Sequence, residues 1–298
     1  MNLYSEKDKN IRKTWVLFAA FLIFIIGVGW TFGQIYNSSA ILIIAVLFSI
    51  ATSFISYWYS DKIVLAMTRA KPVSRENYRE LYNIVENLTI AAGLPMPRVY
   101  IVDEEMPNAF ATGRNPERAV VAVTRGLVER LDRSEIEGVV AHELSHVGNR
   151  DMLVSTMAVV LVGFIAILSD MFLRSMFWGG MSRGSERKGG GQAIFIAIGV
   201  ILAILAPIAA ALIQLAISRR REFLADASGA LLTRYPDGLA SALEKISQYS
   251  KPMAVANNST AHLWLADPYG KKRSFLAKLF MTHPPIEERI AILRGMKI

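Results

Sequence analysis

A stretch from Thr14 to Ser60 contains no charged side chain, and few folds accommodate such a stretch. A helix that spans a lipid bilayer needs about 20 consecutive apolar residues. The stretch holds two segments near this length, about Trp15 to Phe32 and Ser39 to Tyr59. The segment between them, Gly33 to Ser38, is rich in turn-forming residues. Residues 1–60 are therefore predicted to form a membrane hairpin of two helices.

Charge predicts the orientation of this hairpin. The chain has a formal net charge of +8, and its Lys and Arg residues cluster beside the apolar runs. This is the positive-inside pattern of membrane proteins and not a phosphate-binding stripe, so we expect no nucleic-acid partner. Both outer flanks of the hairpin are positive and its turn is not, which places the N-terminus and the chain from residue 61 in the cytoplasm. The absence of Cys excludes disulfides and thiolate metal sites.

Two more uncharged runs follow, Met152 to Ser169 and Gly189 to Ser218. We expect four apolar helices in all, although the positive residues of the loop 170–188 oppose full spanning by the second pair. A partly inserted hairpin at 152–218 therefore stays open as an alternative. The predicted organisation is a membrane hairpin at 1–60, a first half of a soluble domain at 61–151, a second membrane hairpin at 152–218, and a second half at 219–298.

The two soluble segments carry patterns of both helix and strand. Leu81, Ile84, Val85 and Leu88 recur at helical spacing within 76–92. Val99 to Val102 and Ala119 to Val123 are short β-rich runs, and Pro107 to Gly113 is a candidate third strand. In the second segment, Leu239, Leu243 and Ile246 mark one helix, and Ile286, Ile290 and Leu293 mark another. The predicted fold class is mainly α with a small antiparallel β-sheet, in an integral membrane protein.

The motif His142-Glu143-Leu144-Ser145-His146 carries the chemistry. Positions four apart share one face of a helix, so both imidazoles can bind one metal ion, with Glu143 beside them. Ser134 and Glu137 predict a capping box at the start of this helix. H-E-x-x-H is the pattern in which two His bind zinc and the Glu acts as general base, and we expect one zinc ion per chain.

A catalytic zinc site keeps three protein ligands, so this motif needs one more. Glu222 is the best placed, because Asp226 lies one helical turn later and could fix the tautomer of a ligating His. The spacing to a third His in H-E-x-x-H-x-x-G-x-x-H is excluded by Asn149 and Met152. The other candidates are Asp151, Glu244, Glu287, Glu288, His262 and His283.

H-E-x-x-H, two apolar segments and then Glu222-x-x-Ala225-Asp226 resemble the HtpX family of membrane zinc metallopeptidases, gluzincins related to the prenyl-protein (CAAX) peptidases. The resemblance covers nearly the whole chain. It implies a split zincin-like peptidase domain with zinc ligands His142, His146 and Glu222, catalytic base Glu143 and a supporting Asp226. It further implies a multi-pass protein of the bacterial cell membrane, with a cytoplasmic active site and a role in stress-linked quality control of membrane proteins.

Two other stretches are candidates for the site. Asn108, Ala109, Phe110 and Ala111 resemble the edge strand that pairs with a bound peptide in such enzymes, and a plain structural hairpin is the alternative. His283 could stabilise the transition state, but it precedes two prolines and could equally be a helix-entry residue. His262 receives no role.

The expected function is hydrolysis of peptide bonds. The expected substrates are misfolded or damaged membrane proteins and other polypeptides. Two alternatives remain open: a CAAX-type processing peptidase, for which four apolar helices offer only a small cavity, and a non-enzymatic membrane zinc scaffold. A scaffold site would usually be closed by four protein ligands and would leave Glu143 without a task.

Overall fold

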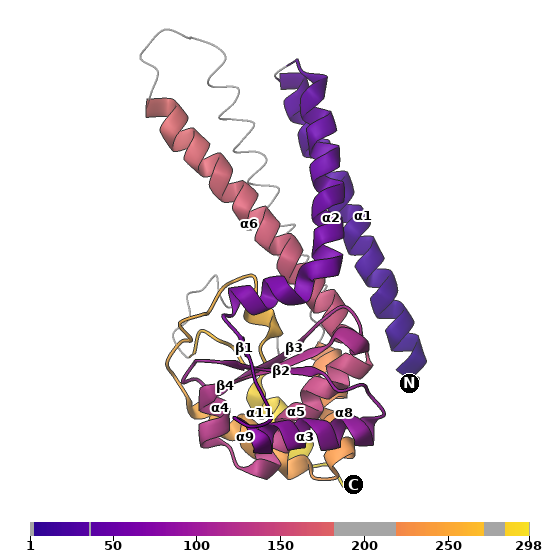
Figure 1. Cartoon of the computed structure of the whole chain (residues 1–298), viewed down its shortest axis with the longest axis vertical. Coiled ribbons are helices and arrows are strands. Elements are labelled where there is room, and N and C mark those ends of the chain that lie inside the picture. The colour runs from indigo at the N-terminus through magenta and orange to yellow at the C-terminus, as the bar shows by residue number, and fades with distance from the viewer. Residues whose placement is uncertain (1–2, 36, 182–218, 271–283, 298) are drawn as a thin grey trace.

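Two long N-terminal helices project from the body of the protein in the computed structural model, which describes residues 3–35, 37–181, 219–270 and 284–297 (Figure 1). They are α1 (Leu3–Ile35) and α2 (Ser39–Met67). Asn10–Thr31 and Ser39–Met67 are each long and apolar enough to cross a membrane. The two helices predicted for the N-terminal hairpin are present, and both extend beyond the apolar segments into polar sequence.

The third apolar run begins helix α6 (Asp151–Met181), which leaves the body of the protein in a different direction from the α1–α2 pair (Figure 1). Its first part, Asp151–Ile165, passes the same test of length and composition only together with α5 (Arg133–Gly148), from which it is bent by 83°. The fourth run, at 189–218, lies outside the described residues. The number of four apolar helices therefore stays a prediction.

A four-stranded sheet lies at the centre of the soluble part, in the order β1-β2-β4-β3. Its strands are β1 (Lys71–Pro72), β2 (Arg98–Val102), β3 (Ala109–Thr112) and β4 (Val120–Thr124). β2 and β4 pair in parallel, whereas β1 with β2 and β3 with β4 pair antiparallel. The prediction of a purely antiparallel sheet was wrong, because β3 takes the edge position beyond β4 and leaves β4 to pair with β2 in the same direction.

Side chains alternate between the two faces of this sheet, as the period of a strand requires. Ala109, Val121 and Val123 pack into a core with α5 and α3 (Arg79–Ala92), on the side of the sheet where Figure 1 places these helices. Phe110 and Ala122 face the other way, toward the end of α2 and the start of α6. Both faces of β3 and β4 are therefore buried, which explains their continuous apolar sequence.

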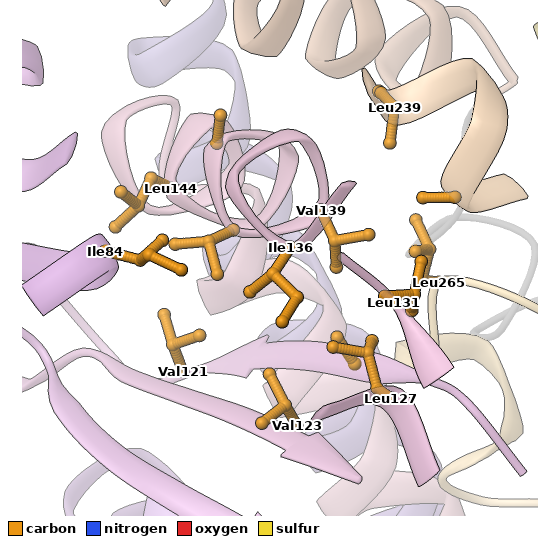
Figure 2. Close-up of a cluster of buried hydrophobic side chains, with 14 of the residues drawn as sticks. Ile84, Val121, Val123, Leu127, Leu131, Ile136, Val139, Leu144, Leu239 and Leu265 are labelled. Atoms are coloured by element: carbon orange, nitrogen blue, oxygen red, sulfur yellow. The ribbon is translucent and has the colours of Figure 1, made fainter. Parts of the chain in front are cut away.

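The larger core joins the two halves of the soluble sequence. Figure 2 shows Ile136, Val139 and Leu144 of α5 between strand residues such as Val121 and the later Leu239 and Leu265. Leu239 belongs to α9 (Pro236–Gln248), and α11 (Ile286–Arg294) adds Leu293. The remaining elements are α4 (Arg125–Arg130), α8 (Arg219–Thr233) and the short 3₁₀ turns η1 (Pro116–Arg118) and η2 (Ala261–Leu263). Helices predicted from Leu81 onward, around Leu239 and around Ile290 are all present.

Candidate metal centre

Helix α5 carries the H-E-x-x-H motif and begins with a capping box two residues earlier than predicted. Asp132 is the N-cap: its Oδ1 accepts from the backbone N–H of Glu135 over 3.0 Å, and the Glu135 side chain accepts from the N–H of Asp132 over 2.8 Å. The prediction of Ser134 and Glu137 was wrong. Ser134 Oγ instead donates to Asp132 Oδ1, and Glu137 pairs with Arg133 at 2.9 Å. Both pairs of residues fit the sequence pattern, and the one nearer to the preceding loop forms the cap.

Helix α8 brings Glu222 to the motif through a close crossing of two helices. A Cβ atom on Gly229 would lie 3.0 Å from the backbone N of His142 and 3.2 Å from the carbonyl carbon of Ala141. The backbones of α8 and α5 therefore touch at Gly229, where a larger residue has no room. Glu222 lies two helical turns earlier on α8, on the face that this crossing turns toward the two His.

Three ligand atoms converge at this crossing. The Nε2 atoms of His142 and His146 are 3.1 Å apart. Glu222 places Oε2 3.7 Å from the first and Oε1 3.7 Å from the second. Bonds of about 2.0–2.2 Å to a tetrahedral zinc would separate the donor atoms by about 3.3 Å. The three donors, within 4.8 Å of one another, therefore fit a zinc ion.

The far ring nitrogens show why these donors favour a cation. Nδ1 of His142 lies 2.9 Å from Asp226 Oδ1, and Nδ1 of His146 lies 3.2 Å from Asp151 Oδ2. A carboxylate accepts, so each Nδ1 carries the proton and each Nε2 turns a lone pair toward the other and toward Glu222. Three lone-pair donors facing one another repel unless a positive charge lies between them.

The pKa values of the two His are shifted in opposite directions. Burial lowers the pKa of His142, which keeps it neutral and able to bind a metal. Burial also lowers the pKa of His146, but the hydrogen bond to Asp151 and the charges of Glu222 and Asp151 outweigh it and raise the pKa to about 9. The carboxylates around His146 therefore favour positive charge here, whether a proton or a metal cation.

Glu143 lies beside the three donors, and its side chain is 1% exposed. Its Oε1 has no hydrogen-bond partner among the described residues, and the backbone of Ala111 slightly favours the ionised carboxylate. Burial, with a smaller effect of Glu222, raises the pKa of Glu143 to about 7 against the opposing charges of His146 and Arg289. A carboxyl group with a pKa near neutrality and a free oxygen is suited to accept and return a proton.

Arg289 is a residue of this site that sequence reasoning missed. Its guanidinium is fully buried and donates to both oxygens of Asp226, with Nη1 3.2 Å from the carbonyl oxygen of Leu265 and 3.7 Å from Glu222 Oε2. Burial alone would raise the pKa of Asp226, but Arg289 and the hydrogen bond to His142 hold that pKa below its usual range. The signal was present: Arg289 lies on the apolar stripe of α11, three residues after Ile286 and four before Leu293.

The predicted edge strand is β3, which does lie at the edge of the sheet. Its first part is already in contact with the chain itself. Leu265 N–H donates to the Ala109 carbonyl oxygen over 2.9 Å, and the Asn108 side-chain amide exchanges hydrogen bonds of 2.8 and 3.0 Å with the backbone of Ala266. Phe110 turns away from the site and packs on Trp264. Ala111 lines the cavity above the metal ligands.

Two other His were candidates. His262 lines the same cavity, and its Nε2 lies 3.1 Å from the carbonyl oxygen of Ser155. His283 lies outside the described residues. Of the alternative third ligands, Asp151 contacts His146 through Nδ1 and so supports a ligand, while Glu244 pairs with Arg294 at 2.6 Å.

Comparison with known proteins identifies the family. The family model described as Peptidase family M48 matches residues 75–297. A protein named Protease HtpX homolog from Thermoanaerobacter pseudethanolicus is 45% identical over 296 residues, 99% of this chain and 98% of its own length. Another of that name from Syntrophobacter fumaroxidans is 50% identical over 287 residues, 95% of this chain and 98% of its own length.

A solved structure shares the fold. The crystal structure of S. mikatae Ste24p aligns with a TM-score of 0.51 at 19% identity, covering 97% of this chain and 67% of that one. The family model covers all the residues of the candidate metal centre, and the bacterial relatives align with nearly the whole chain. The chain belongs to peptidase family M48 and is a membrane metalloprotease.

Proposed function

We propose that the chain is a zinc-dependent endopeptidase in which His142, His146 and Glu222 hold one zinc ion and Glu143 is the general base. The observation that carries this assignment is the convergence of the two Nε2 atoms and a carboxylate, with both Nδ1 atoms turned to Asp226 and Asp151. The alternative of a non-enzymatic scaffold leaves the unpartnered Oε1 of Glu143 unexplained.

A zinc ion held by these ligands supplies Lewis-acid chemistry, acidifying water and polarising a peptide carbonyl. Glu143 takes a proton from the attacking water at its carboxylate and delivers it to the nitrogen of the leaving amine. Asp226 and Asp151 keep the two imidazoles in the tautomer that ligates. Arg289 compensates the negative charge of Asp226 and stays out of contact with solvent.

A polypeptide substrate is proposed to extend along the edge of β3. In the register of β3 with β4, Ala111 is on the same outward-facing side of the ladder as Ala109, whose carbonyl oxygen accepts from Leu265 N–H, and Ala111 lines the cavity together with Glu143. Main-chain pairing at this edge selects extended backbone more than any side chain, which suits a protease of unfolded segments. Asn108 and Ala109 contribute by holding the segment around Leu265 and Ala266 beside the cleft.

The substrates are proposed to be misfolded or damaged membrane proteins, cut on the cytoplasmic side in membrane protein quality control. Two features support this. The α1–α2 pair and the start of α6 hold the site next to the bilayer, and the Lys and Arg residues flanking the first hairpin favour a cytoplasmic peptidase domain. On this proposal the peptidase domain is split into residues 61–151 and 219–298, which share the core of α5, α9 and α11.

Replacement of Glu143 by Gln tests the assignment. The purified variant in detergent should bind zinc as the wild type does and should fail to cleave an unfolded membrane protein. Ser145→Ala on the same helix is a matched control, because Ser145 Oγ donates only to its own helix, at the Ala141 carbonyl oxygen. Cleavage by Glu143→Gln at the wild-type rate would refute the role of Glu143. Cleavage of prenylated peptides but not of unfolded proteins would favour the CAAX-type alternative.

A further inference from the structure

The side chain that orients His146 comes from the bend between α5 and α6. Asp151 is five residues after His146, too far along a straight helix to lie under its ring. The helix is interrupted at Asn149 and Arg150, and Arg150 has a left-handed φ of 55°. Helix α6 then begins at Asp151, and its axis is bent by 83° from that of α5. Asp151 Oδ2 thereby reaches Nδ1 of His146 at 3.2 Å. Asp151 and His146 belong to different helices, so the position of the Asp151 carboxylate depends on contacts outside α5.

The side chain that fixes it comes from the N-terminal membrane helix. Asn10 of α1 donates through Nδ2 to Asp151 Oδ1 over 2.7 Å and to the carbonyl oxygen of Asn149 over 3.1 Å. Its Oδ1 accepts from Arg221 Nη1 over 3.4 Å, and the same Nη1 donates to Asp151 Oδ1 over 3.3 Å. Asn10 is fully buried, and both donor hydrogens and the acceptor of its amide are used.

This arrangement exceeds what anchoring in a membrane requires. A buried amide costs free energy unless all its hydrogen bonds are made, and an apolar residue at position 10 would pack against α6 without that demand. Just beyond it, Leu17, Phe21 and Ile25 pack against Val154, Leu161 and other residues of α6 and so fix the register of the two helices. Asn10 is thus held in place by an apolar contact and directed at the residues of the bend.

We propose that Asn10 is a positioning residue for the metal ligand His146, acting through Asp151, so that the first membrane helix is a structural part of the metal centre. The inference rests on the proposed role of His146 as a zinc ligand. Asn10 and Arg221 hold Asp151 Oδ1, which leaves Oδ2 aimed at Nδ1 of His146 and Nε2 aimed at the metal. Without Asn10, Asp151 has one anchor fewer and the imidazole is less well oriented. Loss of a partner that contacts a ligating His directly, as Asp151 does, typically weakens metal binding about 10–100-fold, and this sets the upper limit for Asn10.

The test is a double-mutant cycle on the full-length protein in detergent, read out as zinc affinity by competition with a chromophoric chelator. Asn10→Ala should weaken zinc binding about 10-fold, the lower end of the range for loss of Asp151 itself. In the Asp151→Ala background the same substitution should have little further effect, because its route to His146 is already gone. Gln34→Ala is the matched control, an exposed amide at the other end of α1, and should leave affinity unchanged.

A structural control separates positioning from general loosening of α1. Leu17→Ala removes a buried contact between α1 and α6 without touching Asp151, so its effect on zinc affinity should be smaller and should add to that of Asp151→Ala. Equal effects of Leu17→Ala and Asn10→Ala, both additive with Asp151→Ala, would overturn the proposal. So would wild-type affinity of Asn10→Ala or, if that variant does not fold, of Asn10→Ser. Failure of the wild type to bind zinc would overturn the ligand assignment and this inference together.

Discussion

Arg289 and Asp226 form a buried, two-pronged ion pair behind the candidate metal ligands. Nε and Nη2 of the guanidinium donate to Oδ2 and Oδ1 over 2.8 and 2.7 Å, and neither side chain is more than 1% exposed. Oδ1 of Asp226 is also 2.9 Å from Nδ1 of His142. The pair therefore connects the C-terminal helix α11 to the first ligand of the H-E-x-x-H motif.

Replacement of Arg289 by Met should destabilise the protein by about 3–5 kcal/mol, because it leaves the carboxylate of Asp226 buried without its counter-charge. Arg289→Lys should recover only part of this loss, since a single ammonium does not reproduce the fork. Denaturant unfolding in detergent measures both. Arg294→Met on the same helix is the control: its ion pair with Glu244 is half exposed, so about 1 kcal/mol or less is expected. Equal losses for the two variants would contradict the prediction.

Asp226→Asn should weaken zinc binding about 10–100-fold with little change in the packed volume. The neutral amide of Asn orients His142 less strongly than a carboxylate does. Its NH₂ group also faces a donor, either the Arg289 guanidinium or Nδ1–H of His142, and loses that hydrogen bond. Equilibrium dialysis against a zinc buffer measures the affinity. Asp237→Asn, an exposed position in the first turn of α9, serves as the comparison and should bind zinc like the wild type. Unchanged affinity for Asp226→Asn would show that Asp226 does not support the ligand.

Gly229→Ala should separate α8 from α5 and displace Glu222 from the two His. The added Cβ would sit 3.0 Å from a backbone nitrogen that cannot rotate away, and such overpacking typically costs about 1–3 kcal/mol. Zinc affinity and the unfolding midpoint should both fall. Gly163→Ala on α6 is the matched control, because its Cβ would meet no atom of the described residues within 4 Å. A Gly229→Ala variant as stable as Gly163→Ala would show that the helices can separate without cost.

Asp132→Ala should remove the N-cap of α5 and cost about 1 kcal/mol at neutral pH. The backbone N–H of Glu135 and the hydroxyl of Ser134 hold the pKa of Asp132 below its usual value. The unfolded chain therefore binds the proton first, so the stabilisation is complete above the unfolded pKa of about 3.9 and is lost as the pH falls through the lower folded value. The difference in unfolding free energy between wild type and variant should accordingly shrink on acidification below pH 4. A difference that stayed constant from pH 7 to pH 3 would mean that the carboxylate is not the cap.

Local patterns were enough to predict much of this protein. The apolar length of α1 and α2, the helical spacing on α3, α5 and α9, and the association of His142, His146 and Glu222 follow from residues close together in sequence or from a motif. The N-cap was misplaced because Asp132 with Glu135 and Ser134 with Glu137 satisfy the same spacing rule. Only the direction from which the chain enters the helix decides between them.

Contacts between distant segments that no motif marks could not be predicted. The parallel pairing of β2 with β4 depends on where the chain between them passes, and no short-range period encodes it. Asn10 lies in a polar segment whose sequence gives no sign that residue 151 is its partner. Arg289 was visible as a charge on an apolar stripe, but its partner Asp226 is on another helix. The support of the metal centre is built from such contacts.

The order in which the proposed ligands appear in the chain sets a time at which the enzyme can become active. A polypeptide is made from its N-terminus, so His142 and His146 leave the ribosome first, and Glu222 follows only after both later apolar runs. Until that point a nascent chain holds two of its three zinc ligands and lacks Asp226 and Arg289 as well. With the proposed ligands, the zinc site can therefore be completed only after the later apolar runs have been synthesised.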